Sequence, residues 1–409
     1  LLAPRFYPYS AVGSVQAARA CGPAFEGGGP LECPGGAEPA ASAEAQLART
    51  AASWPTGEAG ACLPAPKDDR PLQRSGCADL KVPVLTLPPR RPEFQMLDGV
   101  KVFVIGGHSG KKTLSSVEVL RQGRDEHLPS FRASIATTPV HGACAGVKLC
   151  SQTALVMSEK QAGLLDLASL KWTPLPMFWH GSNRRFEMTR CCSVACHDND
   201  HVIFIGGHLG GLDSSGSTNL CFTGASKSGT VAGIHTGPSM SLHRDHSAVL
   251  AIGRGRIMVL GGTSLVKHPD SSVKRTCPLR STEILDKSTM CFEPGPDMTQ
   301  PRSNCSAVRL DGHRAMVFGG YDGSGPLAST EVLDIDTMTF SPGPAMLAPR
   351  SGLIAVLVDV SHVLLLGGGG VENRASTEVL CLDGMMFVHG PEMLSPRLSF
   401  SAFLFQVAS

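Results

Sequence analysis

The sequence has few aromatic residues and no long apolar run. Three Trp and three Tyr occur among its 409 residues, and Phe, Trp and Tyr together make up 5% of the chain. The longest apolar stretch, residues 353–366, is interrupted by Asp359, Ser361 and His362. It is therefore too short and too polar to span a bilayer, and we expect no membrane insertion.

An excess of one charge is also missing. Lys and Arg total 36 against 35 Asp and Glu, which gives a formal net charge of +1. This balance provides no electrostatic reason to expect nucleic acid or an anionic membrane as the main partner. A phosphate-binding loop is absent as well, because none of the Gly-Gly pairs is followed by Gly-Lys-Ser or Gly-Lys-Thr.

The fourteen cysteines show no repeated spacing. The cluster of Cys191, Cys192 and Cys196 has no second ligand pair at the spacing of a zinc site. We therefore predict no metal and no cofactor, and we interpret most cysteines as small apolar residues with reduced thiols. Reduced thiols favour the cytoplasm, with the nucleus as the alternative.

The N-terminal part of the chain differs in composition from the rest. Residues 1–80 contain 18 Ala, 10 Gly and 10 Pro, and apolar periodicity is absent there. Such a segment buries too little apolar surface to offset the entropy of ordering it, so we predict that residues 1–88 are disordered. The chain begins with Leu1 instead of Met, which indicates a fragment or a processed form. Residues 89–409 form the predicted folded domain.

Short runs of β-branched and aliphatic residues, each ending in Gly-Gly, recur through this domain. They occupy residues 102–107, 202–207, 257–262, 315–320 and 363–368. A degenerate copy at residues 154–157 lies near the middle of the first, double interval. A period near 50 residues is typical of a repeat architecture.

The rest of each period also repeats. A Ser-Thr-Glu triplet and an apolar run follow the glycines, and then come an aromatic strand and a Gly-Pro-x-Met element. An arginine stands four residues beyond each Met, and a further strand and a tight turn lead to the next Gly-Gly strand. One period therefore predicts four short antiparallel strands, which is the content of a propeller blade.

These motifs resemble the kelch-repeat β-propeller family over roughly residues 93–407. The resemblance implies an all-β propeller of four-stranded blades, and the count of Gly-Gly strands, with the degenerate copy included, predicts six of them. The strand at residues 400–405 matches the one that normally precedes a Gly-Gly strand, so we predict that it closes the ring and removes the exposed edges. Residues 89–99 partly resemble the same strand, and seven blades are therefore the alternative.

The resemblance also implies a non-catalytic platform for protein–protein interaction. Antiparallel connectivity places the loops after Gly-Gly and the loops with the arginines on one face of the propeller. Guanidinium groups bind carboxylates in a bidentate manner, so this face could bind a partner protein or an acidic peptide. The predicted binding residues are Arg190, Arg244, Arg302, Arg350 and Arg397, with His108, His208 and Tyr321 after the glycines.

A structural role for the arginines is the competing interpretation. Repeats with the arginine also carry a glutamate, at Glu283, Glu331 and Glu378. Buried Arg–Glu pairs would explain both residues without any ligand. The sequence leaves both readings open.

A channel enzyme of the galactose oxidase type is the alternative function. That family holds copper with Tyr and His, and one of its two tyrosines is cross-linked to Cys. Only Tyr321 lies within the repeats of this chain, so the two tyrosines cannot be supplied. The iron motif of kelch specifier proteins fails as well, because Pro301 stands where its histidine would be. We therefore predict that the protein is not an enzyme.

Overall fold

The computed structural model describes residues 94–406, except for 124–125, 138–141, 143, 159–160, 176, 180–192, 197–200, 207–216, 223–231, 268–273 and 371–374. The predicted disordered segment and the domain boundary at residue 89 lie outside the described residues. Within the described part of the chain, no helix has the length and apolar character needed to cross a membrane.

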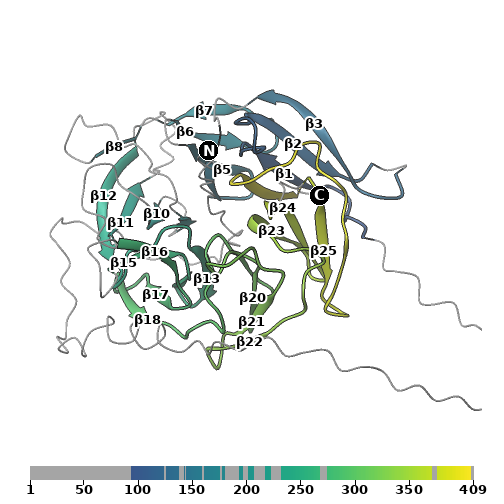
Figure 1. Ribbon diagram of the computed structural model, residues 1–409. Coiled ribbons are helices and arrows are strands. Elements are labelled where there is room, and N and C mark those ends of the chain that lie inside the picture. Colours follow the sequence, from purple (N-terminus) through teal and green to yellow (C-terminus); the bar gives the residue numbers. More distant parts are fainter. Residues whose placement is uncertain are drawn as a thin grey trace, which may run out of the picture. The chain divides into compact units, whose positions relative to one another are not determined.

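The described residues form mainly antiparallel sheets (Figure 1). Six of these sheets are blades, which we number by the chain order of their second strands. Blade 1 contains β27 (Ser401–Gln406), β1 (Val100–Ile105), β2 (Ser116–Arg121) and β3 (Ser130–Thr137). Blade 2 contains β4 (Cys144–Lys148), β5 (Thr153–Ser158), β6 (Ala162–Asp166) and β7 (Trp172–Pro174). Blade 3 contains β9 (Ser193–Cys196), β10 (His201–Ile205), β11 (Ser217–Phe222), β12 (Ala232–Ser239) and the additional β8 (Met177–Trp179).

The remaining blades carry the clearest copies of the repeat. Blade 4 contains β13 (Ala248–Gly253), β14 (Arg256–Leu260), β17 (Thr282–Asp286) and β18 (Cys291–Pro294). Blade 5 contains β19 (Ser306–Arg309), β20 (Arg314–Phe318), β21 (Thr330–Asp334) and β22 (Thr339–Pro342). Blade 6 contains β23 (Ser351–Asp359), β24 (His362–Gly369), β25 (Thr377–Cys381) and β26 (Met386–His389). A separate ribbon pairs β15 (Thr263–Lys267) with β16 (Lys274–Pro278).

The strands within the blades follow the order predicted from the repeat. Five sheets have four strands each, and the sheet of blade 3 has β8 as a fifth strand, parallel to β12. The Gly-Gly runs supply the second strand of five blades, and the degenerate copy supplies β5 of blade 2; these strands are buried on both faces, as in β14 and β24. The prediction of a propeller of four-stranded blades is therefore confirmed.

The innermost strands pack against one another in a closed ring. β13 contacts β19, β19 contacts β23, β23 contacts β27, β27 contacts β4, β4 contacts β9, and β9 contacts β13. The apolar clusters lie between neighbouring blades; one joins strands of blades 4 and 5, and another joins blades 5 and 6. The core is thus shared among blade interfaces, and each blade depends on its neighbours for burial of its faces.

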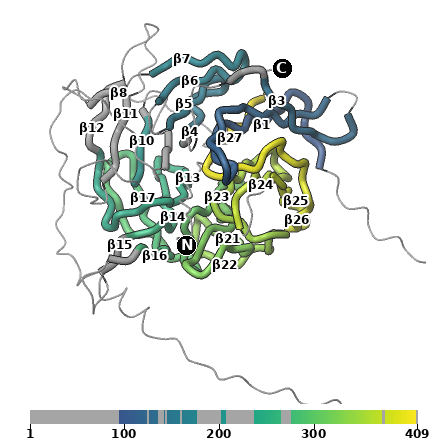
Figure 2. The backbone as a smooth tube through the Cα atoms, turned by 45° about the horizontal axis from the view of Figure 1, so that its top comes forward, coloured from purple at the N-terminus to yellow at the C-terminus, as the bar shows by residue number. Residues whose placement is uncertain are grey.

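The C-terminal strand closes the ring, as predicted. β27 pairs antiparallel with β1, with Val102 opposite Leu404 and Val104 opposite Ala402, so the yellow end of the chain lies beside the blue β1 (Figure 2). This pairing joins residues separated by about 300 positions and covers the edge of β1 that would otherwise be exposed.

The segment before β1 does not form a strand of a seventh blade. Residues 94–97 have no strand pairing, and Phe94 and Met96 are buried in the apolar cluster between blades 1 and 6. The ring of Phe94 meets His362 edge to face with centroids 5.5 Å apart. The described residues 94–97 therefore pack against blades 1 and 6 without pairing as a strand, and the seventh sheet among the described residues is the β15–β16 ribbon, which is not a blade.

The described cysteines are in more than one state. Cys150, Cys277, Cys305 and Cys381 are free, whereas Cys291 is disulfide-bonded. Burial raises the pKa of the Cys305 thiol to about 11, which keeps it protonated and unreactive at neutral pH. The expectation of reduced thiols thus fails for Cys291, and the cytoplasmic location stays a prediction.

Candidate binding face

Two sets of loops lie together on one face of the propeller, which we name the Arg-loop face. It consists of the loops that follow the Gly-Gly pairs and the loops that carry the repeated arginines. Isolated bridges join the two sets, as between His108 and Leu398 and between Tyr321 and Ser303. The predicted common face is therefore present in blades 1 and 5.

The repeated arginines are buried beneath this face. The side chains of Arg244, Arg302, Arg350 and Arg397 are exposed by 2% or less. Each guanidinium lies within 3.0 Å of a glutamate carboxylate, that of Glu283, Glu331, Glu378 or Glu118 in the same order. A ligand on the surface cannot reach these groups, so the geometry favours structural pairing over ligand contact.

Arg302 shows how one arginine joins two blades. Its Nε donates to Glu331 Oε1 at 2.8 Å, and its Nη1 donates to the carbonyl oxygens of Gly319 at 2.8 Å and Ser329 at 2.9 Å, all in blade 5. Its own carbonyl accepts from the N–H of Gly262 in blade 4 at 2.9 Å. The side chain is thus fixed to one blade and the backbone to the blade before it.

The glutamate fixes the loop as well. Glu331 Oε2 accepts from the backbone N–H of Thr299 at 2.6 Å, and Glu378 and Glu283 accept from the equivalent N–H groups of Leu347 and Ser241 at 2.7 Å. Burial lowers the pKa of the Arg244 guanidinium, and the charge of Glu283 raises it. Because Arg has such a high ordinary pKa, the guanidinium remains protonated at neutral pH.

Sequence reasoning missed Glu118, the partner of Arg397. Arg397 Nη2 donates to Glu118 Oε1 at 2.7 Å, across 279 positions of the chain. The signal was present, since Ser116, Glu118 and Leu120 occupy the same places as Ser281, Glu283 and Leu285. This pair connects the C-terminal segment to blade 1 and so supports the closure by β27.

Blade 2 replaces the pair with two glycines. Gly142 takes the place of the arginine, because its carbonyl accepts from Gly107 N–H at 2.7 Å, as the Arg302 carbonyl does from Gly262. Gly163 takes the place of the glutamate in β6. A Cβ at Gly163 would lie 2.3 Å from Trp172 Cζ2, so the indole of Trp172 covers the position where the carboxylate would project.

The residues directly after Gly-Gly differ from blade to blade. Tyr321 is 37% exposed, and its hydroxyl donates to the Gly323 carbonyl at 2.8 Å. His108 is half-buried, and its Nδ1 accepts from the N–H of Gly110 at 2.9 Å. Thr263 has the same place in blade 4. The predicted residues Arg190 and His208 lie outside the described residues.

A line of left-handed residues runs along the inner ends of the arginine loops. The residue two positions after the arginine has φ of 57° at His246, 53° at Asn304, 70° at Gly352 and 55° at Ser399. Backbone bonds link neighbouring blades there: Asn304 N–H donates to His246 O at 2.9 Å, and Gly352 N–H donates to Asn304 O at 2.9 Å. The loops are thus held in one conformation near the ring axis.

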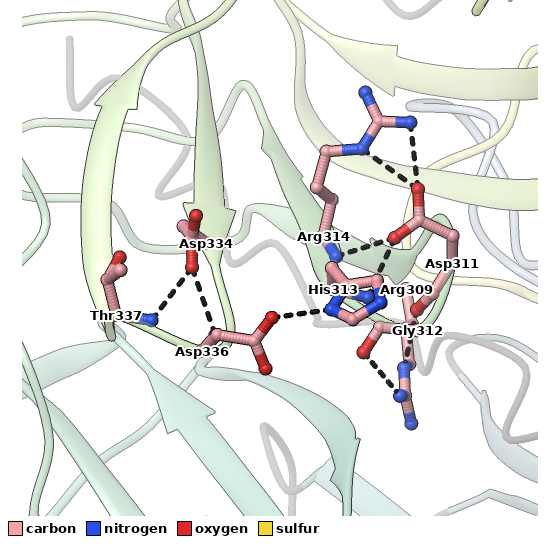
Figure 3. A network of polar contacts seen from close by, with 8 residues as sticks. All are labelled: Arg309, Asp311, Gly312, His313, Arg314, Asp334, Asp336 and Thr337. Atoms are coloured by element: carbon pink, nitrogen blue, oxygen red, sulfur yellow. Dashed lines mark hydrogen bonds and ion pairs between the residues drawn. The ribbon is translucent and has the colours of Figure 1, made fainter.

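The opposite face carries an exposed polar network in blade 5 (Figure 3). Asp311 accepts from the backbone N–H of His313 at 2.8 Å and from the Arg314 Nε at 2.8 Å. His313 Nδ1 lies 2.5 Å from Asp336 Oδ2, and this hydrogen bond raises the pKa of the histidine. These contacts order the two turns of one blade.

No group of three His, Cys, Asp or Glu side chains is placed to hold a metal ion in the part of the chain that the structure describes. The side chain of His243 is paired instead with a carboxylate, with Nε2 3.1 Å from Asp245 Oδ1.

Comparison with known proteins identifies the repeat. Residues 301–347 match the family model described as Kelch motif, a segment that runs from the arginine loop before β19 to the loop after β22. This chain is a β-propeller with a kelch motif. No curated protein matches the sequence significantly. Kelch propellers commonly take part in protein interactions and are generally not enzymes.

Proposed function

We propose that this kelch propeller is a non-catalytic platform that binds a partner protein through the Arg-loop face. The observation that carries the proposal is the contrast between a repeated support and variable loops. The same Arg–Glu contacts recur in blades 1, 4, 5 and 6, whereas His108, Thr263 and Tyr321 differ at one equivalent position. Variable loops on a rigid support are a common arrangement for recognition.

The arginines have an indirect part in this proposal. They position the loops, and contact with the partner falls to side chains that solvent reaches. Tyr321 is suited to contact because Tyr combines apolar area with a hydroxyl and loses little entropy on binding. His108 is the corresponding residue in blade 1, and the exposed Leu347 and Leu394 lie on arginine loops of the same face.

The test compares variants of the two faces by cross-linking and affinity capture with the full chain. The Tyr321→Ala, His108→Ala double variant should bind the partner of the wild type at least about tenfold more weakly. This corresponds to a loss of about 1.4 kcal/mol in binding free energy. The control double variant, Asp336→Ala, His313→Ala, alters the opposite face and should retain capture. Equal capture by both variants would overturn the proposal that the Arg-loop face binds the partner.

A further inference from the structure

Positive side chains gather at two inner turns on the face opposite to the Arg-loop face. The β13–β14 turn joins Gly253 to Arg256, and the β19–β20 turn joins Arg309 to Arg314. Because β13 contacts β19 in the ring, the two turns are neighbours close to the ring axis. Residues 253–256 and 309–314 contain four arginines but only one carboxylate; the arginines are Arg254, Arg256, Arg309 and Arg314, and the carboxylate is Asp311.

The single carboxylate is already paired. Asp311 Oδ2 accepts from Arg314 Nε at 2.8 Å, and Arg314 Nη2 lies 2.8 Å from the same oxygen (Figure 3). Arg309 donates instead to two backbone carbonyls, from Nε to Asp311 O at 2.7 Å and from Nη2 to Gly312 O at 2.9 Å. A carbonyl oxygen carries no net charge, so these bonds leave the positive charge of Arg309 without a counter-ion.

Arg254 and Arg256 also lack a carboxylate partner. Arg254 is exposed and Arg256 is half-buried, and neither forms an ion pair with a described residue. Within the described chain, Arg256 Nε is buried and has no hydrogen-bond partner. The pKa of Asp286 is lowered by hydrogen bonds from Ser288 and further by the charge of Arg256, but the hydrogen bonds of that carboxylate come from Ser288. Three arginines of the two turns therefore have no ion-pair partner within the described fold.

Gly253 allows the two blades to bring these arginines together. It has φ of 87°, and a Cβ there would lie 2.8 Å from Arg309 Nη1, so the guanidinium from blade 5 lies directly against the residue before Arg254. A Cβ at Gly255 would meet nothing within 4 Å, which leaves the tip of this turn open to solvent. The two carbonyl bonds hold the Arg309 side chain in place before any ligand arrives.

We propose that Arg254, Arg256 and Arg309 bind the phosphate group of a phosphoserine or phosphothreonine in a partner protein. Such a phosphate has a charge of about −1.5 to −2 at neutral pH and three acceptor oxygens, and a guanidinium can pair with two oxygens at once. It therefore supplies the charge and the acceptors that the three arginines lack within the fold. This phosphate site is separate from the Arg-loop face and adds a second binding surface to the propeller.

A phosphorylated protein segment fits the phosphate site better than a membrane or a nucleic acid does. Anionic membranes are recognised by clusters of about four to eight Lys and Arg, and nucleic acids by a series of phosphate contacts along the backbone. Here three unpaired arginines are confined to the inner turns, and the outer turns of the same blades carry the carboxylates of Asp286, Asp334 and Asp336. A flat or extended polyanion would meet these carboxylates, whereas a single phosphate is small enough to avoid them.

Fluorescence anisotropy of a labelled Gly-Ser peptide with one phosphoserine, added to the full chain, tests the phosphate site. The wild type should bind this peptide at least about tenfold more tightly than the unphosphorylated peptide. The Arg254→Gln, Arg256→Gln variant should bind it at least about tenfold more weakly than the wild type, because charge-assisted hydrogen bonds to the phosphate are lost. Arg309→Lys should also weaken binding, since Lys cannot replace the planar fork of Arg.

The matched control neutralises two adjacent positive residues on the Arg-loop face. Lys111→Gln, Lys112→Gln removes the same charge, and both lysines are exposed in the loop after the first Gly-Gly pair. This control, and the Tyr321→Ala, His108→Ala variant, should bind the phosphopeptide within about twofold of the wild type. Circular dichroism and the unfolding temperature of each variant verify that the propeller is intact.

The inference is overturned if the wild type does not bind the phosphopeptide, or if the arginine and lysine variants lose equal affinity. It also fails if a peptide with glutamate in place of phosphoserine binds equally well, because the site would then not distinguish phosphate from carboxylate. Equal affinity for inorganic phosphate would assign the site to a free anion. Arginine-dependent binding to vesicles with phosphatidylinositol bisphosphate, without binding of the phosphopeptide, would assign it to a lipid head group. The proposed function is tested by other variants on the other face, so it stands if the phosphate site is rejected.

Discussion

At the scale of single residues, the buried Arg–Glu pairs are the main polar feature of this propeller. Taking both charges out of water costs several kcal/mol, and the pair offsets this only because the carboxylate and guanidinium meet further partners. Arg302 has such partners in the Gly319 and Ser329 carbonyls, and Glu331 has one in Thr299 N–H. Removal of one member therefore leaves an uncompensated buried charge.

The Arg302→Met variant should lose about 3–5 kcal/mol in the free energy of unfolding, because the buried Glu331 carboxyl would lose its guanidinium partner. The double variant Arg302→Met, Glu331→Met should be less destabilised than the sum of the single variants. Urea unfolding of the four proteins of this cycle measures the coupling. The exposed pair of Arg280 and Asp297 is the control, since Arg280→Met should cost at most about 1 kcal/mol. Additive losses at Arg302 and Glu331 would contradict the pairing.

At the scale of elements, the Gly-Gly turn fixes the distance between blades. Gly319 has φ of 57° in blade 5, and a Cβ there would lie 2.4 Å from the Arg350 carbonyl oxygen in the next arginine loop. The following Gly320 has φ of 101°, and its N–H donates to that same oxygen at 2.8 Å. Side chains are therefore excluded both by the backbone conformation and by the close approach of the next loop.

The Gly319→Ala variant should lose about 2 kcal/mol or more of stability, because a backbone oxygen cannot move aside without shifting the arginine loop. Gly312→Ala is the matched control in the same blade, because a Cβ at Gly312 meets nothing within 4 Å. Thermal and urea unfolding of the two variants give the comparison. A loss in Gly312→Ala as large as that in Gly319→Ala would refute the close-approach argument.

The period of the Gly-Gly runs made the blades predictable, because each second strand is buried on both faces and needs a continuous apolar run. The closing role of residues 400–405 was predictable for the same reason. The β15–β16 ribbon and the parallel pairing of β8 with β12 were not predicted, since pairing between segments is not encoded in a local pattern. Whether the arginines form internal pairs or bind a ligand depends on how deeply their side chains are buried. The sequence alone does not show this burial.

At the scale of the whole molecule, the ring is closed by two contacts between distant parts of the chain. One is the β27–β1 pairing, and the other is the Arg397–Glu118 pair. The inner strand β27 contacts both β23 and β4, so it completes the apolar clusters on each side of blade 1. Closure therefore adds burial as well as backbone hydrogen bonds.

A chain truncated after Arg397 should unfold at a markedly lower temperature and should tend to self-associate, because the edge of β1 and the apolar faces beside it become exposed. Size-exclusion chromatography and thermal unfolding measure both effects. Removal of residues 407–409 alone is the control, since it leaves β27 complete, and should change neither. A synthetic peptide of residues 398–406, added in trans, should raise the unfolding temperature of the truncated chain in proportion to its concentration, as expected for a ligand of the native state. A truncated chain that remains monomeric with the wild-type unfolding temperature would show that the other blades hold the ring without its closing strand.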